Sequence, residues 1–87
     1  MIAVRSRTIL LAALLAHLPA AALAENDAKS AARDHFELGK ALYSRSDYAG
    51  AIREFRESYR LFPLPALLFN VARSHEALGQ HASARFA

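Results

Sequence analysis

A helical pattern that repeats at an interval of about 33 residues constrains this chain more than any single residue does. Residues 38–63 contain two short amphipathic stretches, which a polar turn joins and a proline ends. A weaker copy follows, in which residues 70–81 correspond to residues 37–48. Self-similarity at this period is typical of helical arrays, in which each unit buries its apolar face against a neighbour. The sequence therefore favours a helical array that binds other proteins over a compact enzyme.

The first 24 of the 87 residues have the pattern of a secretory signal peptide. A basic start, an apolar core and a small-residue cleavage site follow one another there, as in signal peptides generally. A retained membrane anchor is the alternative. However, His17 and Pro19 interrupt the apolar run 8–24, which is shorter than the ~20 residues of a spanning helix. We therefore expect the general secretory route, cleavage after Ala24, and a mature chain that is periplasmic or secreted.

The composition excludes several kinds of protein. The chain has no cysteine, so disulfides, thiolate metal sites and a bacterial lipoprotein anchor are excluded. Its formal net charge is +3, but residues 25–87 hold nine Lys and Arg against eight Asp and Glu, which leaves +1. Binding to nucleic acid requires a clustered basic face, which such a balance does not indicate. We therefore expect no nucleic-acid partner.

The first predicted helix begins at Ala28, after an N-cap at Asn26 or Asp27. Its apolar residues recur at intervals of three and four, which is the spacing of a helix and not of a strand. Gly39 in a helix interior costs ~1 kcal/mol relative to Ala, so we expect a neighbouring helix to approach closely there. The apolar stripe comprises Ala32, Phe36, Gly39 and Tyr43, with Ala31, Leu38 and Leu42 beside it.

Two more helices and the opening of a fourth are predicted after the polar turn 44–47. Asp47 is the expected N-cap of the second helix, and Pro63 ends it. Pro65 suits the first turn of the third helix, and Gly79 in a left-handed conformation would end that helix before residues 81–87 open another. The apolar residues of the second helix are Tyr48, Ile52, Phe55, Tyr59 and Phe62, and those of the third are Leu67, Leu68, Val71, Ala72, His75 and Leu78.

These residues resemble the tetratricopeptide repeat family, of the exported bacterial type. Ser58 replaces the Ala that is usual in the family, Ala72 replaces the glycine of the first helix, and no Trp is present. The matching positions of repeat 1, about 31–64, are Phe36 or His35, Leu38-Gly39, Leu42, Tyr48, Ala51, Phe55, Ser58 and Pro63. Those of a partial repeat 2, about 65–87, are Val71-Ala72, His75, Gly79, His81 and Ala84.

The resemblance implies an all-α fold, in which antiparallel helical hairpins form a solenoid after the signal peptide. Residues 25–87 would then hold about one and a half repeats. Arrays of this kind usually need three or more repeats to bury a continuous core. The resemblance therefore also leaves open a fragment of a larger array, or a chain that covers its edges by self-association.

In this family the first helix of each repeat lines a concave groove that holds a peptide or a partner helix. Asn70 can bond a peptide backbone there, and Arg73 can hold a carboxylate at two points. The family's clamp for a terminal carboxylate would have a cation where Phe36 stands. The alternative is that Lys40 and Arg73 are only solvated, and that Asn70 bonds the loop between repeats. The groove residues implied by the resemblance are Arg33, Phe36, Glu37, Lys40, Tyr43, Phe69, Asn70, Arg73 and Glu76.

The sequence contains no motif with the spacing of a catalytic or metal site. His75-Glu76 begins like the zinc protease motif, but Gly79 stands where the second His would be. We expect His75 and His81 to pack in the core instead. Spacings that suggest a catalytic triad and a glycine-rich phosphate loop are also missing. We therefore expect no enzyme activity, no cofactor and no metal.

The sequence thus predicts an exported interaction module, an adaptor or scaffold whose partner is another protein or a peptide. No stable membrane insertion is expected after cleavage. The second helix also resembles an amphipathic helix that lies on a membrane surface, but Glu54 and Glu57 on its polar side would be repelled by anionic lipids. The alternative is a self-associating structural fragment of a larger array, a homo-oligomer that pairs through exposed edges near Pro65 and Phe86.

Overall fold

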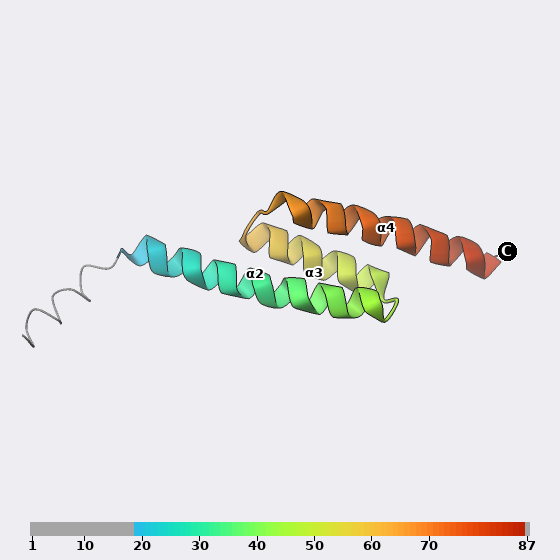
Figure 1. Cartoon of the computed structure of the whole chain (residues 1–87), viewed down its shortest axis with the longest axis horizontal. Helices are drawn as coiled ribbons and strands as arrows, with labels where there is room; N and C mark the ends of the chain where they lie inside the picture. Colours follow the sequence, from blue (N-terminus) through green and yellow to red (C-terminus); the bar gives the residue numbers. More distant parts are fainter. Residues whose placement is uncertain (1–18, 87) are drawn as a thin grey trace, which may run out of the picture.

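The computed structural model describes residues 19–86, and within them every regular element is a helix. Helix α2 spans Ala20–Ser44, α3 spans Tyr48–Leu61 and α4 spans Pro65–Phe86 (Figure 1). This part of the chain is all-α, as predicted. Residues 1–18, which hold most of the predicted signal peptide, lie outside the described residues.

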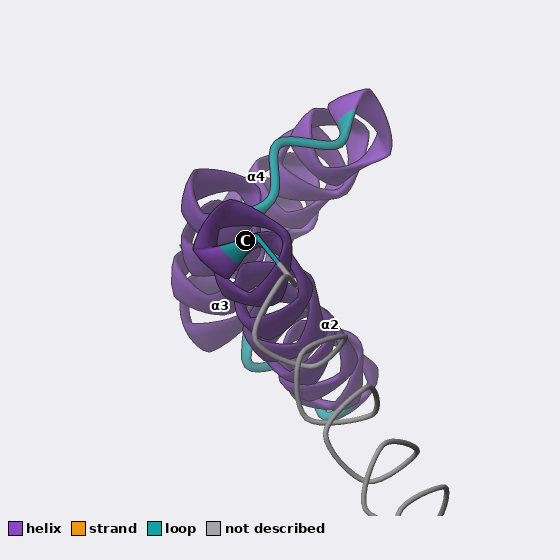
Figure 2. Ribbon diagram, turned by 90° about the vertical axis from the view of Figure 1, so that its left-hand side faces the viewer, coloured by secondary structure: helices purple, strands orange, loops and turns teal. Residues whose placement is uncertain are grey.

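The three helices run antiparallel in sequence order, with α3 between the other two (Figure 1). Helix α3 packs against both α2 and α4, whereas α2 and α4 make little contact with each other. The end-on view shows that the helices do not lie in one plane: α3 lies to one side, and α2 and α4 diverge from it (Figure 2). The face between α2 and α4 is therefore open, and α3 forms its floor.

The turn between α2 and α3 is built as its polar residues predict. Asp47 caps α3, because its Oδ1 accepts a hydrogen bond of 2.9 Å from the backbone N–H of Gly50. Ser46 has a φ of 64°, in the left-handed region, and this reverses the chain direction. At the other end α3 stops at Leu61, and Pro65 is the first residue of α4. The predicted N-cap and the predicted roles of the two prolines are confirmed.

Helix α2 begins earlier than predicted. It starts at Ala20, with Pro19 in the N-cap position and no side-chain cap, so Asn26 and Asp27 lie inside the helix. The predicted N-cap at these residues is wrong for this chain. The reason is local, since residues 20–24 are four alanines and a leucine, which are the strongest helix formers.

The predicted turn at Gly79 and the predicted fourth helix are also wrong. Helix α4 runs without interruption to Phe86, and no glycine of residues 19–86 has a positive φ. At the repeat interval Gly79 corresponds to Ser46, and Gln80 corresponds to Asp47. Gln is not among the side chains that cap helices well, so the second copy lacks the hydrogen bond that closes the first turn. Residues 78–84 are exposed, and those after His81 project past the packed part of the molecule.

The core is centred on Ala51, Phe55 and Leu67, one residue cluster shared by α3 and α4. The ring of Phe36 on α2 packs against Phe55 with ring centroids 5.9 Å apart. Gly39 makes this approach possible, because a Cβ at that position would lie 2.7 Å from the Phe55 ring. The prediction that Gly39 permits a close helix contact is confirmed. Around this core lie the partly buried side chains of Phe36, Leu42, Tyr43, Tyr59 and Val71.

The inward face of α4 differs from the predicted stripe. Leu67, Val71 and Ser74 face α3, and Ser74 is fully buried with its Oγ donating to the carbonyl of Asn70 at 2.7 Å. Successive residues of a helix point about 100° apart, so the positions one further along the chain turn outward. The predicted core residues that are exposed instead are Leu68, Ala72, His75 and Leu78 on α4, and Leu38 on α2.

Neither histidine that was predicted to pack in the core does so. The Nε2 atom of His75 accepts a hydrogen bond of 3.2 Å from Arg56 on α3, at the surface. His81 is exposed and lies edge-on to the ring of Tyr48, with centroids 6.1 Å apart. Both residues therefore link α4 to α3 from outside the core.

Candidate functional site

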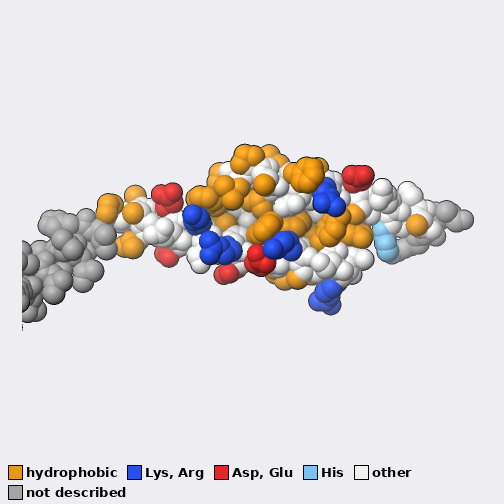
Figure 3. All heavy atoms as spheres, viewed as in Figure 1, with side chains coloured by type: hydrophobic (Ala, Val, Ile, Leu, Met, Phe, Trp, Pro, Cys, Tyr) orange, Lys and Arg blue, Asp and Glu red, His pale blue; other side chains and the backbone are white. Residues whose placement is uncertain are grey.

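Two open hollows lie next to each other on the face between α2 and α4. Apolar side chains gather in the middle of this face, with Lys and Arg side chains among and around them (Figure 3). The first hollow has a volume of about 190 Å³ and the second about 200 Å³. Asn70 of α4 lines both hollows. We call the two hollows together the groove.

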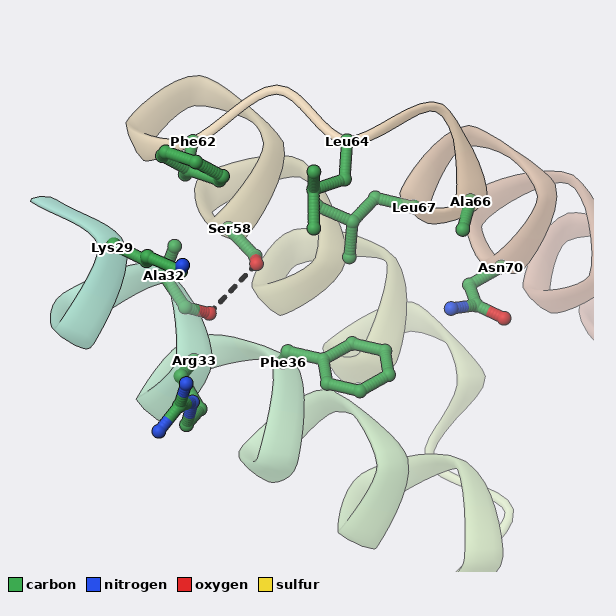
Figure 4. A pocket seen from close by; sticks show the side chains of 10 residues that line it. All are labelled: Lys29, Ala32, Arg33, Phe36, Ser58, Phe62, Leu64, Ala66, Leu67 and Asn70. Carbon is green, nitrogen blue, oxygen red and sulfur yellow. Dashed lines mark hydrogen bonds between the residues drawn. The ribbon is translucent and has the colours of Figure 1, made fainter.

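The first hollow is mainly apolar, and all three helices contribute residues to its lining. Phe36 of α2 and Asn70 of α4 project into it from opposite walls, and Phe62 lies at its end (Figure 4). At its base the buried Ser58 donates a hydrogen bond of 2.7 Å to the backbone carbonyl of Ala32, which holds α3 against α2. The full lining is Lys29, Ala32, Arg33, Phe36, Ser58, Phe62, Leu64, Ala66, Leu67 and Asn70.

The second hollow continues the groove along α2 toward the turn at residues 45–47. It is more polar than the first, because two cations and two polar side chains are four of its six lining residues, against four of ten in the first hollow. Its lining comprises Lys40, Tyr43, Ser44, Phe55, Asn70 and Arg73. A chain lying in the groove would therefore pass from a mainly apolar site to a more polar one.

Three cations of the groove lie over aromatic rings. Lys40 Nζ is 4.8 Å from the centroid of Phe36, and it also pairs with Glu37 at 3.1 Å. Lys29 Nζ lies 5.7 Å from the ring of Phe62. The guanidinium of Arg73 lies 5.9 Å from the ring of Phe69. Contacts of this kind are weak at exposed sites, about 0.5–1 kcal/mol, so they hold the charges near the groove without neutralising them.

Six of the nine predicted groove residues line the hollows. They are Arg33, Phe36, Lys40, Tyr43, Asn70 and Arg73. Glu37, Phe69 and Glu76 do not line either hollow, although Glu37 and Phe69 contact the cations that do. Sequence reasoning missed Lys29, which is four residues before Arg33 and could have been found by that helical spacing. It also missed Leu64, whose position in the loop before α4 no periodicity predicts.

The outer surface of the molecule carries the other charge contacts. Nδ1 of His35 on α2 donates to Oε2 of Glu54 on α3 at 2.5 Å. Arg60 donates two hydrogen bonds to Glu57, and these bonds with the nearby positive charge lower the pKa of the Glu57 carboxyl. The acidic groups of α3 are thus occupied away from the groove.

Residues 19–86 offer no group of three or more side chains that could hold a metal ion. In the same part of the chain, none of the helices combines the length and the apolar character needed to cross a membrane. No protein-family model, no curated protein and no solved structure matches the chain. The groove and its charges are therefore the basis for assigning a function.

Proposed function

We propose that this protein is an exported interaction module of the tetratricopeptide type, an adaptor or scaffold that performs no catalysis. It binds an extended segment of another protein in the groove between α2 and α4. The observation that carries the proposal is that one face of the hairpin array presents two adjoining hollows with a shared amide side chain, Asn70.

Features of the first repeat support the tetratricopeptide assignment. Helices α2 and α3 form an antiparallel hairpin, and Gly39 and Phe55 make the close contact between them that the family pattern requires. Pro63 separates this hairpin from α4, which begins the second unit of the sequence repeat. The small residue expected at position 58 is a serine, and its hydroxyl bonds to α2 instead of leaving space.

The groove has the parts that recognition of an extended chain needs. An extended peptide exposes its backbone N–H and C=O groups, and the Asn70 amide can donate to one and accept from another. Arg73 beside it can hold a carboxylate at two points. The apolar walls of the first hollow offer a place for a side chain, and burial of that side chain would add ~25 cal/mol for each Å² removed from water.

Two observations support export. Residues 1–24 carry the three-part pattern of a signal peptide. Residues 20–27 of α2 are exposed and extend past the part of α2 that packs on α3. Cleavage after Ala24 would therefore leave the hairpin and the groove intact.

Selection from a random peptide library tests the proposal directly. The full chain is immobilised, and bound peptides are sequenced and remade for affinity measurements. We expect Asn70→Ala and Arg73→Ala to weaken their binding about tenfold each, which is ~1.4 kcal/mol. Arg53→Ala, on the exposed face of α3, is the matched control and should bind as the parent does. Failure to select any peptide, or binders that ignore both groove variants, would refute the proposal.

Self-association is the second candidate, because α4 exposes large apolar side chains. Leu68 is 50 % and Phe69 64 % exposed. Sedimentation of the full chain distinguishes the two functions. A homo-oligomer should dissociate with Leu68→Glu and be unaffected by Asn70→Ala, whereas a monomeric module should keep its mass with both. The side chain of Phe86, also predicted to lie at this edge, is outside the described residues.

A further inference from the structure

We propose that the segment bound in the groove is acidic: an extended peptide that places an apolar side chain in the first hollow and carboxylates on either side of it. This inference rests on the proposed function and adds the chemistry of the partner. It follows from the distribution of charge around the two hollows, from the apolar lining of one of them, and from their order along α2.

The groove has an excess of positive charge. Its lining includes four cations, Lys29, Arg33, Lys40 and Arg73, and no carboxylate. The ion pairs within residues 19–84 join Lys40 to Glu37, His35 to Glu54, and Arg60 to Glu57. Three of the four groove cations thus have no carboxylate partner in that part of the chain. A basic segment would be repelled from this surface, and an acidic one would be attracted.

The cations lie at the edges of apolar surface and not in a uniform basic patch. Lys29 and Arg33 line the same hollow as Phe36, Phe62 and Leu67. A polyanion without apolar groups would leave that hollow filled only with water. A peptide with one large apolar side chain would exclude the water. The carboxylate on one side of it would then meet Lys29 or Arg33, and the carboxylate on the other side would meet the cations of the second hollow, Lys40 and Arg73.

The spacing of the cations along α2 sets the spacing of the acidic residues. Arg33 and Lys40 are seven residues apart, or about 10 Å along a helix that rises 1.5 Å per residue. Lys29 and Lys40 are eleven residues apart, or about 16 Å. An extended peptide covers ~3.3 Å per residue. The two acidic positions should therefore be about three to five residues apart, with the apolar residue between them.

A defined peptide library tests this chemistry separately from peptide binding itself. Each peptide is acetylated and amidated, so that no terminal carboxylate is present. The central residue is Leu or Gln, and the flanking positions vary among Glu, Gln and Lys. Immobilised full chain should retain peptides with a central Leu and with Glu on both sides. Their affinity should fall about tenfold from low to high salt, because exposed charges are screened.

Variants of the protein identify which cations contact the acidic residues of the peptide. Arg33→Gln should lower the affinity for the Glu peptides about threefold, since exposed ion pairs contribute modestly. The double variant with Arg33→Gln and Arg73→Gln should lower this affinity about tenfold or more. Arg33→Lys should restore most of the binding. Arg53→Gln on the exposed face of α3 removes the same charge away from the groove and should have no effect. Circular dichroism of each variant verifies that it is folded.

Three results would overturn the inference. If the protein retains peptides with flanking Lys, or shows no preference among Glu, Gln and Lys, the acidic partner is refuted and the proposed function still stands. Equal binding of peptides with central Leu and central Gln would refute the role of the first hollow. If neither this library nor the random library yields a binder, the proposed function fails as well.

Discussion

Gly39 and Gly79 show how the same residue has opposite effects at two positions of one chain. At Gly39 the missing side chain leaves room for the Phe55 ring, which approaches to 2.7 Å from where a Cβ would be. At Gly79 a Cβ would have nothing within 4 Å, and the backbone is helical. The first glycine is required by packing, and the second only weakens the helix that contains it.

Alanine at each position should therefore change stability in opposite directions. We expect Gly39→Ala to reduce the free energy of unfolding by about 1–3 kcal/mol, because the ring must move. Gly79→Ala should raise it by up to ~1 kcal/mol, the difference in helix propensity. Urea denaturation followed by circular dichroism measures both. Destabilisation by Gly79→Ala would show that α4 turns at this residue in solution.

Ser58 forms a hydrogen bond between helices, whereas Ser74 bonds within its own helix. Ser58→Ala should cost about 0.5–1.5 kcal/mol of unfolding free energy, since the bond to the Ala32 carbonyl is lost. Ser74→Ala should cost less, because its bond to Asn70 does not join two elements and Ala is the better helix former. The two variants are compared by thermal unfolding. Equal losses would mean that the bond between helices contributes nothing of its own.

At the scale of elements, the sequence repeat predicts a turn at two corresponding positions, but the chain turns only at the first. The first turn closes because Ser46 adopts a positive φ and Asp47 caps α3. The corresponding pair in the second copy is Gly79 and Gln80, and there the helix continues. Glycine adopts the left-handed conformation more easily than serine does. A residue that can adopt this conformation is therefore not sufficient to form the turn. The cap, and a following helix that packs on its predecessor, are what complete the first turn.

The contribution of the Asp47 cap can be measured with a conservative control. Asp47→Ala should destabilise the chain by about 1 kcal/mol, because the Gly50 N–H loses its acceptor. Asp47→Asn keeps a side-chain oxygen in that position and should be close to the parent. Chemical denaturation of the three proteins gives the comparison. If Asn were as harmful as Ala, the negative charge and not the hydrogen bond would be responsible.

At the scale of the whole molecule, the packed part is shorter than the helices that form it. The exposed start of α2, residues 20–27, and the exposed end of α4, residues 82–84, both extend past the contact with α3. The core is therefore small, and its buried apolar residues come mainly from α3. Domains of about this size bury a limited fraction of their surface and have marginal stability.

Removal of residues 1–24 should thus leave the fold unchanged. We expect the 25–87 chain to have the same midpoint of urea unfolding as the full chain, since the residues removed from α2 are exposed. Circular dichroism and sedimentation of the same samples test this and give the oligomeric state. A lower midpoint for the shorter chain would mean that the segment before Glu25 contributes to packing, which would argue against a cleaved signal peptide.

The sequence by itself determined where helices begin and end when the signal is local. The Asp47 cap, the stop before Pro63, the start at Pro65 and the small residue at Gly39 all act through contacts within a few residues or through one obligatory close approach. Six of the nine groove residues were placed by a different route, the resemblance to the tetratricopeptide repeat, in which the first helix of each repeat lines the groove.

Only the tertiary structure decided the rotation of α4 and the full extent of the groove. The apolar pattern of α4 allowed either Leu67 or Leu68 to face inward, and packing on the α3 core selected Leu67. That choice turned His75 outward and buried Ser74. It also brought Asn70 of α4 opposite Phe36 of α2, although these two helices hardly touch each other. Such placements depend on how one helix packs against another, and the periodicity within a single helix does not predict this.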